Sequence, residues 1–349
     1  MILNLEANAP IDQVENLLER LSNMGFEVVV NRGDARTSLA IVRGVDDKTR
    51  PELFTHLPLV ENVMPFRDKY KLSGRDFQDA PTVIDIKGTR IGGGNFTVMA
   101  GPCAVESPEQ IMGIAEVVAH EGATVLRGGA FKPRTSPYDF QGMGEKGLIA
   151  MKAAADAHGL VSITEAMRPE EVPLVAKYVD ILQIGARNMQ NFALLQAAGQ
   201  SGKPVMLKRG LSATYNEFLL AAEYIISFGN PQVILCERGI RTFETYTRNT
   251  LDLTAVPVLR ELTHLPIIVD PSHGTGRRSL IEPMSKASMA VGADGVMIEV
   301  HTNPDAAISD AQQTIAPEAF HHLMGTLQRM GKALDIPLSV KQQPTRMAS

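Results

Sequence analysis

The sequence has 349 residues, of which 44% are hydrophobic and 21% are charged, and its formal net charge is −5. This length allows one barrel of roughly 250 residues with a small module beside it. The negative charge argues against non-specific binding to nucleic acid, and no apolar run approaches the roughly 18 residues of a membrane span. Cys103 and Cys236 cannot form a disulfide framework, and no signal peptide is evident at Met1, so we expect a cytoplasmic protein.

Residues 1–66 are expected to form a small α+β domain. The expected elements are a strand (Met1–Ala7), a helix (Ile11–Met24), two strands around a turn at Gly33-Asp34 (Phe26–Val30 and Ser38–Val42), a short helix (Thr49–His56) and a strand (Val60–Pro65). This βαββαβ order is the ferredoxin-like pattern. Because the fold alone does not fix a role, both regulation and a structural or dimerising function remain open.

A run of charged residues separates this part from the rest of the chain. Residues 67–81 are dense in charge and contain Gly74, so we expect a linker. Residues 82–338 are expected to form the second domain, beginning with a hairpin of Val83–Ile86 and Arg90–Gly92 that closes one end of it. Residues 339–349 are polar and are expected to be a frayed tail.

From Phe96 onward, short apolar strands alternate with amphipathic segments. The expected strands are Phe96–Ala100, Thr124–Arg127, Val161–Glu165, Ile181–Gly185, Val205–Lys208, Val233–Cys236, Ile267–Val269 and Gly295–Val300. The amphipathic segments include Glu109–Glu121, Gly147–His158, Glu217–Ser227 and Leu280–Val291. Eight strands with helical connections favour a (β/α)8 TIM barrel. An open doubly wound sheet is the alternative, weakened because no G-x-G-x-x-G motif opens a helix after the first strand.

Ionisable side chains follow nearly every expected barrel strand. They are Arg127, Glu165, Arg187, Lys208, Arg209, Glu237, Arg238, Asp270, His273 and Glu299. In such barrels the working groups lie at the carboxyl ends of the strands, and charges placed there need partners or a ligand. The loop after the second strand adds Lys132, Arg134, Thr135 and Ser136, a good receptor for phosphate oxygens. The pattern predicts an anion-binding active site, and a solvated basic loop is the alternative.

Closing the barrel would also assemble a metal site. Cys103 follows the first strand, His273 follows the seventh, Glu299 lies in the eighth and Asp310 lies in the loop after it. A thiolate, an imidazole and two carboxylates suit one divalent transition metal ion, such as Mn, Fe, Co or Zn. Alternatively, Cys103 is a small buried hydrophobe and His273 a capped loop residue. Cys236 is interpreted as such a buried residue, and His264, His321 and His322 as surface or helix residues.

These residues resemble a known family, the 3-deoxy-D-arabino-heptulosonate 7-phosphate synthases, in their shorter bacterial subtype with an N-terminal ferredoxin-like, ACT-type regulatory domain. The resemblance covers essentially all of residues 82–335. It rests on Ala100-Gly101-Pro102-Cys103, Leu126–Gly129 with Lys132–Ser136, Gly185-Ala186-Arg187-Asn188, Leu207-Lys208-Arg209-Gly210, Cys236-Glu237-Arg238-Gly239 and Asp270-Pro271-Ser272-His273. In residues 1–66 it concerns the arrangement of elements rather than a motif.

The resemblance implies that the substrates are phosphoenolpyruvate and erythrose 4-phosphate. Phosphoenolpyruvate would be held by Arg127, Arg187, Lys208 and Arg238, with the backbone at Ala186. Arg134 and Thr135 would hold the phosphate of the aldose, in a loop that also contains Pro133 and Ser136, and Lys132 would lie between the substrates. Cys103, His273, Glu299 and Asp310 would bind the metal. Lys132, His273, Glu165 and Asp270 are the candidate catalytic residues, and the sequence does not choose among the candidates for proton delivery.

The resemblance also implies regulation and assembly. We expect feedback inhibition by tyrosine or phenylalanine, bound between the N-terminal domains of neighbouring subunits in a homodimer or homotetramer. Three alternatives remain. A 3-deoxy-D-manno-octulosonate 8-phosphate synthase is disfavoured because that family typically carries a Lys-Ala-Asn-Arg type loop where this chain has Lys132-Pro133-Arg134-Thr135. The others are a Schiff-base aldolase that uses Lys208 and an amino-acid sensor without catalysis.

Overall fold

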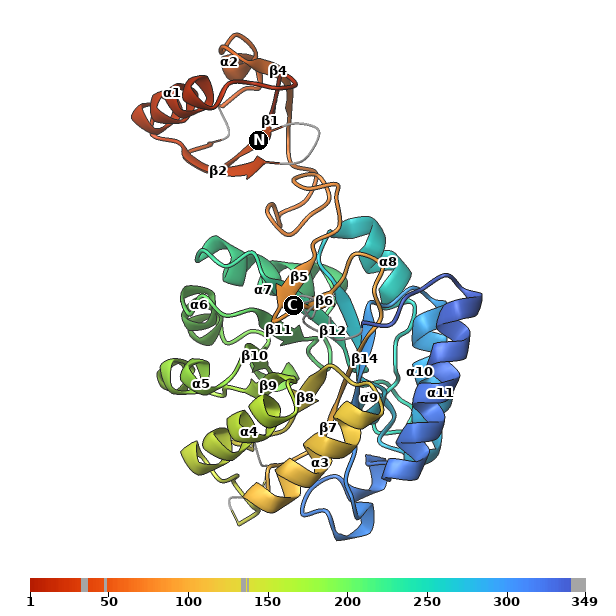
Figure 1. Ribbon diagram of the computed structural model, residues 1–349. Coiled ribbons are helices and arrows are strands. Elements are labelled where there is room, and N and C mark those ends of the chain that lie inside the picture. Colours follow the sequence, from red (N-terminus) through yellow and green to blue (C-terminus); the bar gives the residue numbers. More distant parts are fainter. Residues whose placement is uncertain (33–36, 47–48, 133–135, 137, 340–349) are drawn as a thin grey trace, which may run out of the picture. The chain divides into compact units, whose positions relative to one another are not determined.

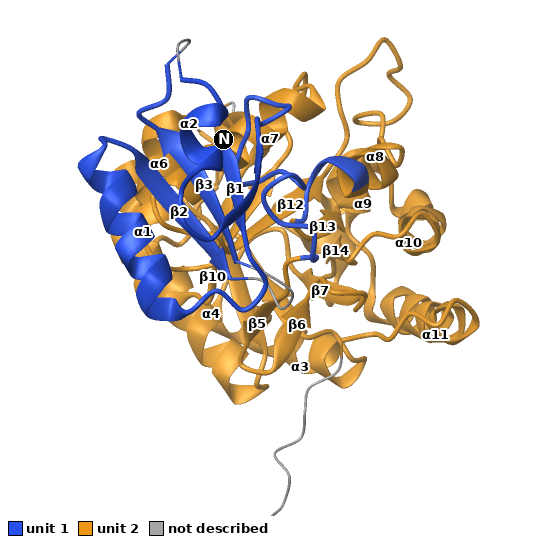
Figure 2. Cartoon of the chain, turned by 90° about the horizontal axis from the view of Figure 1, so that it is seen from above, with its two compact units in different colours: residues 1–81, 261–264 blue, residues 82–260, 265–349 orange. Residues whose placement is uncertain are grey.

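The structure, a computed structural model, describes residues 1–32, 37–46, 49–132, 136 and 138–339 (Figure 1). The chain divides into two compact units, drawn in different colours in Figure 2. Unit 1 contains residues 1–81 and 261–264, and unit 2 contains residues 82–260 and 265–349. The turn expected at Gly33-Asp34 lies outside the described residues. Among the described residues, the structure contains no helix that could span a membrane.

Unit 1 contains a four-stranded antiparallel sheet in the order β2-β3-β1-β4. Its elements are β1 (Ile2–Leu5), α1 (Ile11–Asn23), β2 (Glu27–Arg32), β3 (Thr37–Arg43), α2 (Glu52–Thr55) and β4 (Val60–Met64). Leu17 and Leu21 of α1 are buried, and they share one core with Leu3, Leu39 and Phe54. The ferredoxin-like prediction is confirmed, although the second helix is shorter than the Thr49–His56 span expected for it.

The rest of unit 1 consists of residues 67–81, which contact residues 261–264 from much later in the sequence. Gly74 forms a β-bridge with Thr263, and the Thr263 hydroxyl donates a hydrogen bond to the carbonyl of Ser73. His264 Nε2 lies 2.8 Å from the carbonyl oxygen of Leu72, and His264 is buried. The interpretation of His264 as a surface or helix residue is therefore wrong, because a segment 192 residues earlier covers it.

Unit 2 is a closed barrel of parallel strands, formed within the described residues in the order β7-β8-β9-β10-β11-β12-β13-β14. The strands are β7 (Thr97–Gly101), β8 (Val125–Arg127), β9 (Val161–Glu165), β10 (Ile181–Ile184), β11 (Val205–Lys208), β12 (Val233–Glu237), β13 (Ile267–Val269) and β14 (Gly295–Glu299). Closure occurs between β14 and β7, where Glu299 pairs with Gly101. The (β/α)8 prediction is confirmed, and the doubly wound alternative is excluded.

Helices surround these strands (Figure 1). They are α3 (Pro108–His120), α4 (Glu145–Ala157), α5 (Val172–Tyr178), α6 (Phe192–Gln200), α7 (Tyr215–Ser227), α8 (Ala255–Leu262), α9 (Pro271–Thr275), α10 (Ile281–Ala290) and α11 (Pro317–Ala333). Local sequence defines several of their first turns. The Ser107 hydroxyl accepts a hydrogen bond from the Gln110 amide, and Thr214 forms a capping box with Glu217 before α7.

A hairpin of β5 (Ile84–Ile86) and β6 (Thr89–Ile91) precedes the barrel. Ile84 and Ile91 are buried in one cluster with side chains from the strands, including Met99 and Val125, so the hairpin covers the interior at one end, as expected. At the other end of unit 2's chain, Ser339 is buried and its amide donates to the carbonyl of Phe96. Residues 340–349, most of the expected tail, lie outside the described residues.

Candidate active site

The carboxyl ends of the barrel strands surround a cavity of about 210 Å³. Its lining contains seven lysine and arginine side chains: Arg127, Lys132, Arg187, Lys208, Arg238, Arg241 and Arg248. Glu165 and Asp310 are the lining carboxylates among the described residues, so cations outnumber anions. A cavity with this excess of fixed positive charge favours small ligands that carry phosphate or carboxylate groups.

Two of these guanidinium groups have buried nitrogen atoms without partners. Arg127 Nε and Arg238 Nη1 have no hydrogen-bond partner among the described residues. Burial lowers the pKa of Arg238, although the negative charge of Asp270 opposes this effect. A buried donor without a partner is costly and calls for an explanation, and a bound anion would supply the missing acceptors.

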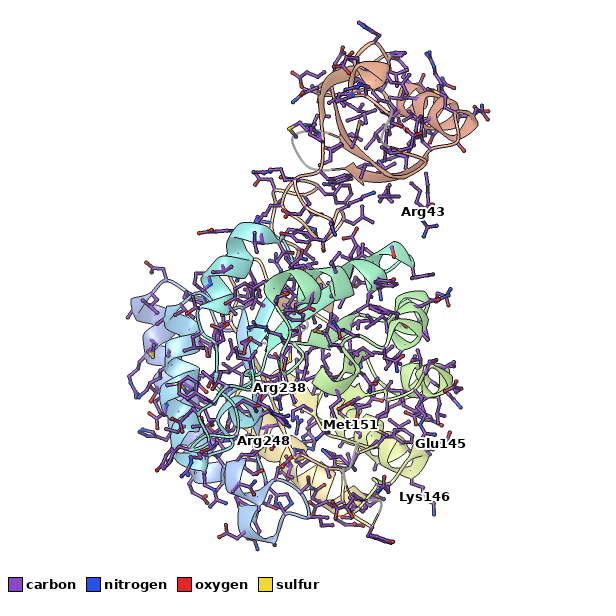
Figure 3. The ribbon with its side chains drawn as sticks, turned by 180° about the vertical axis from the view of Figure 1, so that it is seen from behind. Arg43, Glu145, Lys146, Met151, Arg238 and Arg248 are labelled. Atoms are coloured by element: carbon purple, nitrogen blue, oxygen red, sulfur yellow. The ribbon has the colours of Figure 1, made fainter. Side chains whose placement is uncertain are left out.

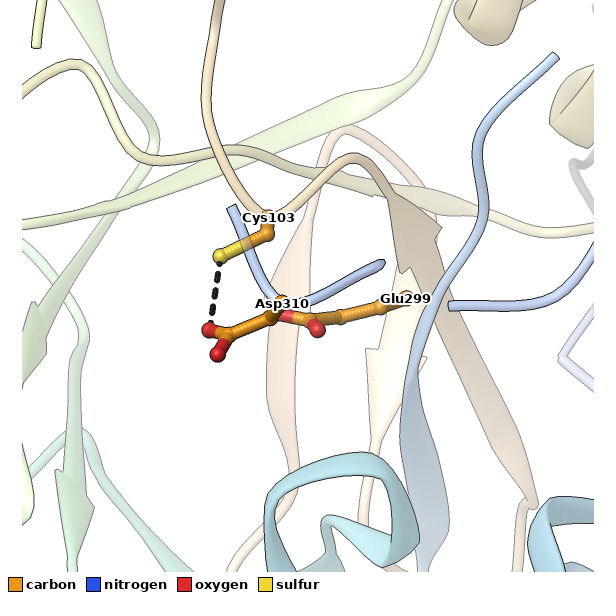
Figure 4. A group of neighbouring side chains, drawn as sticks. All are labelled: Cys103, Glu299 and Asp310. Carbon is orange, nitrogen blue, oxygen red and sulfur yellow. Dashed lines mark hydrogen bonds between the residues drawn. The ribbon is translucent and has the colours of Figure 1, made fainter. Parts of the chain in front are cut away.

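Three potential metal ligands meet at the side of the cavity where β14 closes onto β7. Cys103, Glu299 and Asp310 each offer one ligand atom, and these atoms all lie within 4.8 Å of one another (Figure 4). Cys103 Sγ lies 3.1 Å from Asp310 Oδ2. Burial, together with the charge of Glu299, raises the pKa of the Cys103 thiol to about 12. A divalent cation would relieve this repulsion and ionise the thiol, so the donor set fits a transition metal.

Lys132 already places a positive charge against this group. Its Nζ lies 2.9 Å from Cys103 Sγ and 2.9 Å from the Cys103 carbonyl oxygen. The approach is possible because residue 129 is glycine, where a Cβ atom would lie 2.7 Å from the Lys132 side chain. The side chain expected between the two substrates therefore contacts the metal ligand expected on the first strand.

His273 joins the group through Glu299. Its Nε2 lies 3.4 Å from Glu299 Oε1, while its Nδ1 lies 2.8 Å from Asp270 Oδ2. Burial lowers the pKa of His273, which favours the neutral imidazole that binds metals. A neutral ring that donates from Nδ1 to a carboxylate presents the lone pair of Nε2 toward the site, an orientation typical of metal-binding histidines.

Asp270 is fully buried at the end of β13 and caps the short helix α9. Its Oδ1 accepts from the His273 amide at 2.9 Å, and its Oδ2 accepts from Lys208 Nζ at 2.5 Å. Burial acts to raise the pKa of Asp270, but His273 and Lys208 outweigh it and hold the pKa well below its ordinary value. The carboxylate therefore accepts hydrogen bonds at both oxygens from the two residues that it orients.

Another part of the lining contains Glu165, Ala186 and Arg187. Glu165 Oε2 accepts a hydrogen bond from Gln183 Nε2 at 3.2 Å. Residue 185 is glycine, where a Cβ atom would lie 2.2 Å from Glu165 Oε1, so the missing side chain leaves room for the carboxylate. Glu165 and Ala186 thus line the cavity, as the sequence predicted.

The structure does not bring every predicted residue into the cavity. Ser136 is not among the described residues that line it, and its hydroxyl accepts from the Tyr138 amide at 3.3 Å. Pro133, Arg134 and Thr135 lie outside the described residues. Conversely, Gln183, Arg241, Arg248 and Asn249 line the cavity and were not predicted. Arg248 lies within the barrel unit with Arg238 (Figure 3).

Arg248 also lines a larger hollow of about 1170 Å³ beside the cavity. Its walls include Tyr246, Arg277 and residues of α10 and α11, such as Ile281 and Leu323. The smaller cavity is the better candidate for catalysis, because it alone of the two includes Cys103 and His273 in its lining.

A (β/α)8 barrel whose mouth combines a cationic cavity with potential metal ligands defines an enzyme that acts on anionic small molecules. Residues 79–335 match the family model described as "DAHP synthetase I family", and residues 1–68 match the "DAHP synthase ferredoxin-like domain". The chain belongs to the DAHP (3-deoxy-D-arabino-heptulosonate 7-phosphate) synthase family.

Known proteins of similar sequence support this assignment. The chain is 47% identical over 339 residues to phospho-2-dehydro-3-deoxyheptonate aldolase of Thermotoga maritima, a match that covers 97% of this chain and 100% of the relative. A crystal structure of DAHP synthase from that organism covers 97% of this chain and 98% of its own, with a TM-score of 0.78 and 46% identity. A truncated form of the Thermotoga maritima enzyme covers 77% of this chain and 99% of its own, with a TM-score of 0.73 and 49% identity.

More distant relatives carry the name of the alternative activity. A 2-dehydro-3-deoxyphosphooctonate aldolase from Desulfatibacillum aliphaticivorans is 30% identical over 259 residues, which are 69% of this chain and 94% of the relative. The match therefore covers nearly the whole of this relative. It leaves almost a third of the present chain unmatched. The Thermotoga maritima relative, by contrast, matches nearly the whole length of both chains.

Proposed function

We propose that this enzyme condenses phosphoenolpyruvate with erythrose 4-phosphate and water to give 3-deoxy-D-arabino-heptulosonate 7-phosphate and phosphate, the first step of the shikimate pathway. The observation that carries the proposal is the cavity in which Cys103, His273 and Asp310 face seven cationic side chains. Two phosphorylated substrates repel one another, and fixed cations offset that repulsion while they hold the reactants near attack distance.

Phosphoenolpyruvate would occupy the part of the cavity near Arg238, Lys208 and Arg187. The unpartnered Arg238 Nη1 would donate to its phosphate or carboxylate, and so would Arg127 Nε. The phosphate of the aldose would bind at Arg134 and Thr135, as the resemblance implies. Lys132 precedes that loop and contacts Cys103, so it would lie between the two substrates.

In the reaction, carbon 3 of phosphoenolpyruvate attacks the aldehyde carbon, water adds at carbon 2, and phosphate leaves by cleavage of its bond to carbon 2. A divalent ion held by Cys103, His273, Glu299 and Asp310 would act as a Lewis acid toward the aldehyde oxygen. Lys132 and Glu165 line the cavity and are the candidates for moving a proton or orienting the water. Asp270 would act by orienting His273 and Lys208.

Unit 1 would regulate the enzyme. Its ferredoxin-like fold and its match to the family's own N-terminal domain support the binding of tyrosine or phenylalanine between units of neighbouring subunits. This arrangement requires a homodimer or a homotetramer, which equilibrium sedimentation with and without each amino acid would distinguish. A monomer that is still inhibited would contradict this site.

The test of the activity is product analysis with erythrose 4-phosphate and, separately, with arabinose 5-phosphate. The protein is first treated with a chelator and then supplied with Mn, Fe, Co or Zn, and the release of phosphate and the mass of the sugar acid are measured. We expect a seven-carbon product and no turnover before metal is added. Faster turnover of arabinose 5-phosphate would favour the octulosonate reaction, and full activity in a metal-free enzyme would refute the metal's role.

A further inference from the structure

Gln313 connects the two carboxylates of the site proposed for the metal. Its side chain is fully buried, and its Nε2 donates to Glu299 Oε2 at 2.7 Å. Its Oε1 accepts from Arg248 Nη1 at 2.9 Å, and the same nitrogen lies 3.2 Å from Asp310 Oδ1. One amide and one guanidinium therefore form a continuous path of hydrogen bonds from Glu299 to Asp310.

This path engages one oxygen of each carboxylate and leaves the other facing the site, where Glu299 Oε1 also accepts a hydrogen bond from Arg127 Nη1 at 2.9 Å. Glu299 Oε1, the oxygen that Gln313 does not contact, lies 3.4 Å from His273 Nε2. Asp310 Oδ2, the oxygen that Arg248 does not contact in this path, lies 3.1 Å from Cys103 Sγ. Gln313 and Arg248 thus hold both carboxylates from the outer side with one oxygen toward Cys103 and His273, and Arg127 adds a contact to Glu299.

The chemistry of the neighbours fixes the orientation of the amide. A carboxylate only accepts hydrogen bonds and a guanidinium only donates them, so the Gln313 nitrogen must face Glu299 and its oxygen must face Arg248. A glutamate at this position could serve Arg248 but would repel Glu299, and an apolar residue could serve neither. A side-chain amide satisfies both neighbours at once.

The local backbone places Gln313 where it is needed. Asp310 adopts a left-handed conformation with φ of 56°, and the 3-10 helix Ala311–Gln313 follows it directly. The Gln313 amide donates to the Asp310 carbonyl at 3.1 Å. This hydrogen bond closes the turn and keeps Gln313 on the same short loop as Asp310.

We propose that Gln313 and Arg248 are positioning residues that hold Glu299 and Asp310 in the orientation in which they bind a divalent cation. The inference rests on the proposed metal site. Neither Gln313 nor Arg248 would contact the cation itself. Loss of such outer partners typically weakens metal binding about tenfold to a hundredfold.

The experiment titrates the metal-free full chain with Co²⁺ and follows the absorption band that a thiolate ligand such as Cys103 gives with cobalt. The variants are Gln313→Met and Arg248→Met, which remove the hydrogen bonds from either end of the path. Gln312→Met is the matched control, because Gln312 is exposed and lines the neighbouring hollow instead. We expect about tenfold to hundredfold weaker Co²⁺ binding and an altered band in both test variants, with the control unchanged.

The double variant tests whether the two residues act as one unit. If they do, the double variant should bind Co²⁺ with about the same affinity as the single variant of lower affinity, because the first substitution already breaks the path. Test variants that bind like the control would overturn the proposal, and additive losses would overturn the coupling of the two residues into one unit. Thermal unfolding of the metal-free proteins identifies a variant that fails to fold. Arg248→Met is the less disruptive of the two substitutions, because the Arg248 side chain is 35% exposed. Failure of the unsubstituted protein to bind Co²⁺ would instead refute the metal site itself.

Discussion

Lys208 donates a hydrogen bond to Asp270, with 2.5 Å between Nζ and Oδ2. Both side chains are buried, and the same carboxylate oxygen lies 2.8 Å from His273 Nδ1. One aspartate thus joins a residue of the proposed phosphoenolpyruvate site to a proposed metal ligand. The pair also argues against the Schiff-base alternative, because an ammonium that donates to a carboxylate has no lone pair for attack on a carbonyl.

Replacing Asp270 with asparagine should therefore disturb both halves of the site. An amide has only one acceptor oxygen, so its NH2 would face either Lys208 Nζ and His273 Nδ1 or the backbone amide of His273, all of which now donate to the carboxylate. We expect metal affinity to fall about tenfold to a hundredfold and kcat to fall with it. Isothermal titration with Mn²⁺ and steady-state kinetics measure the two effects.

The control for this experiment is Asp305→Asn, the same change at a side chain that is 85% exposed. The control should match the unsubstituted protein in both measurements. Unchanged metal affinity and kcat in Asp270→Asn would show that Asp270 does not orient these groups. Separately, a borohydride-trapped adduct at Lys208 in the unsubstituted enzyme would restore the Schiff-base mechanism.

The two proposed substrate subsites predict opposite kinetic signatures. Arg238→Ala removes a buried cation with an unpartnered nitrogen, so it should raise the KM for phosphoenolpyruvate. A lost hydrogen bond to a charged group corresponds to about a tenfold to hundredfold change. Arg134→Ala should instead raise the KM for erythrose 4-phosphate far more than that for phosphoenolpyruvate. Equal effects of either substitution on both constants would contradict this division.

The barrel and the approach of Cys103 to Glu299 were predictable because they depend on strand order. Parallel strands that alternate with helices close in one way, and closure brings Cys103 beside Glu299 wherever the intervening chain runs. Apolar strands that end in charged residues indicated which end of the barrel contains the site. Local patterns were therefore sufficient for the fold and for the side of the barrel on which the site lies.

The outer contacts of the site depend on loop conformations that no local pattern encodes. Gln313 is useful only because Asp310 adopts a left-handed conformation and the next residues form a 3-10 turn. Arg248 reaches Gln313 across a separation of 65 residues. His264 gave no periodic signal of burial, since the segment that covers it is irregular. The sequence shows Gln313 three residues after the candidate ligand Asp310, but glutamine is too common in loops for this spacing to predict a contact.

His264 should make stability depend on pH. Burial lowers the pKa of His264 from 6.5 to about 4, against the opposing effect of its hydrogen bond to Leu72. Between these two values the unfolded chain binds a proton that the folded chain does not. The stabilisation is thus fully present above about pH 6.5 and is lost as the pH falls toward 4, by roughly 3 kcal/mol at most.

Urea unfolding at several values between pH 7 and pH 4 measures this effect. In His264→Gln the amide can still donate to the Leu72 carbonyl but does not titrate, so the decline in unfolding free energy should be shallower. His56→Gln, the same change at an exposed histidine, is the control and should keep the slope of the unsubstituted protein. Identical slopes in all three proteins would show that His264 does not cause the loss.

Two truncations should separate regulation from stability. Removal of residues 1–66 deletes the sheet of unit 1 but keeps Leu72, Ser73 and Gly74 in contact with residues 261–264. We expect this protein to keep its kcat and to lose inhibition by tyrosine or phenylalanine. Inhibition that persists in it would place the effector site outside residues 1–66.

Removal of residues 1–81 goes further and deletes the segment that covers His264 and Thr263. Both side chains would lose hydrogen-bond partners, each worth about 1 kcal/mol, and the buried surface beneath the segment would meet water. We expect a lower melting temperature than in the shorter truncation, with inhibition equally absent from both. Equal melting temperatures would mean that residues 67–81 are a plain linker, whereas the bridge between Gly74 and Thr263 indicates that they stabilise the chain they cover.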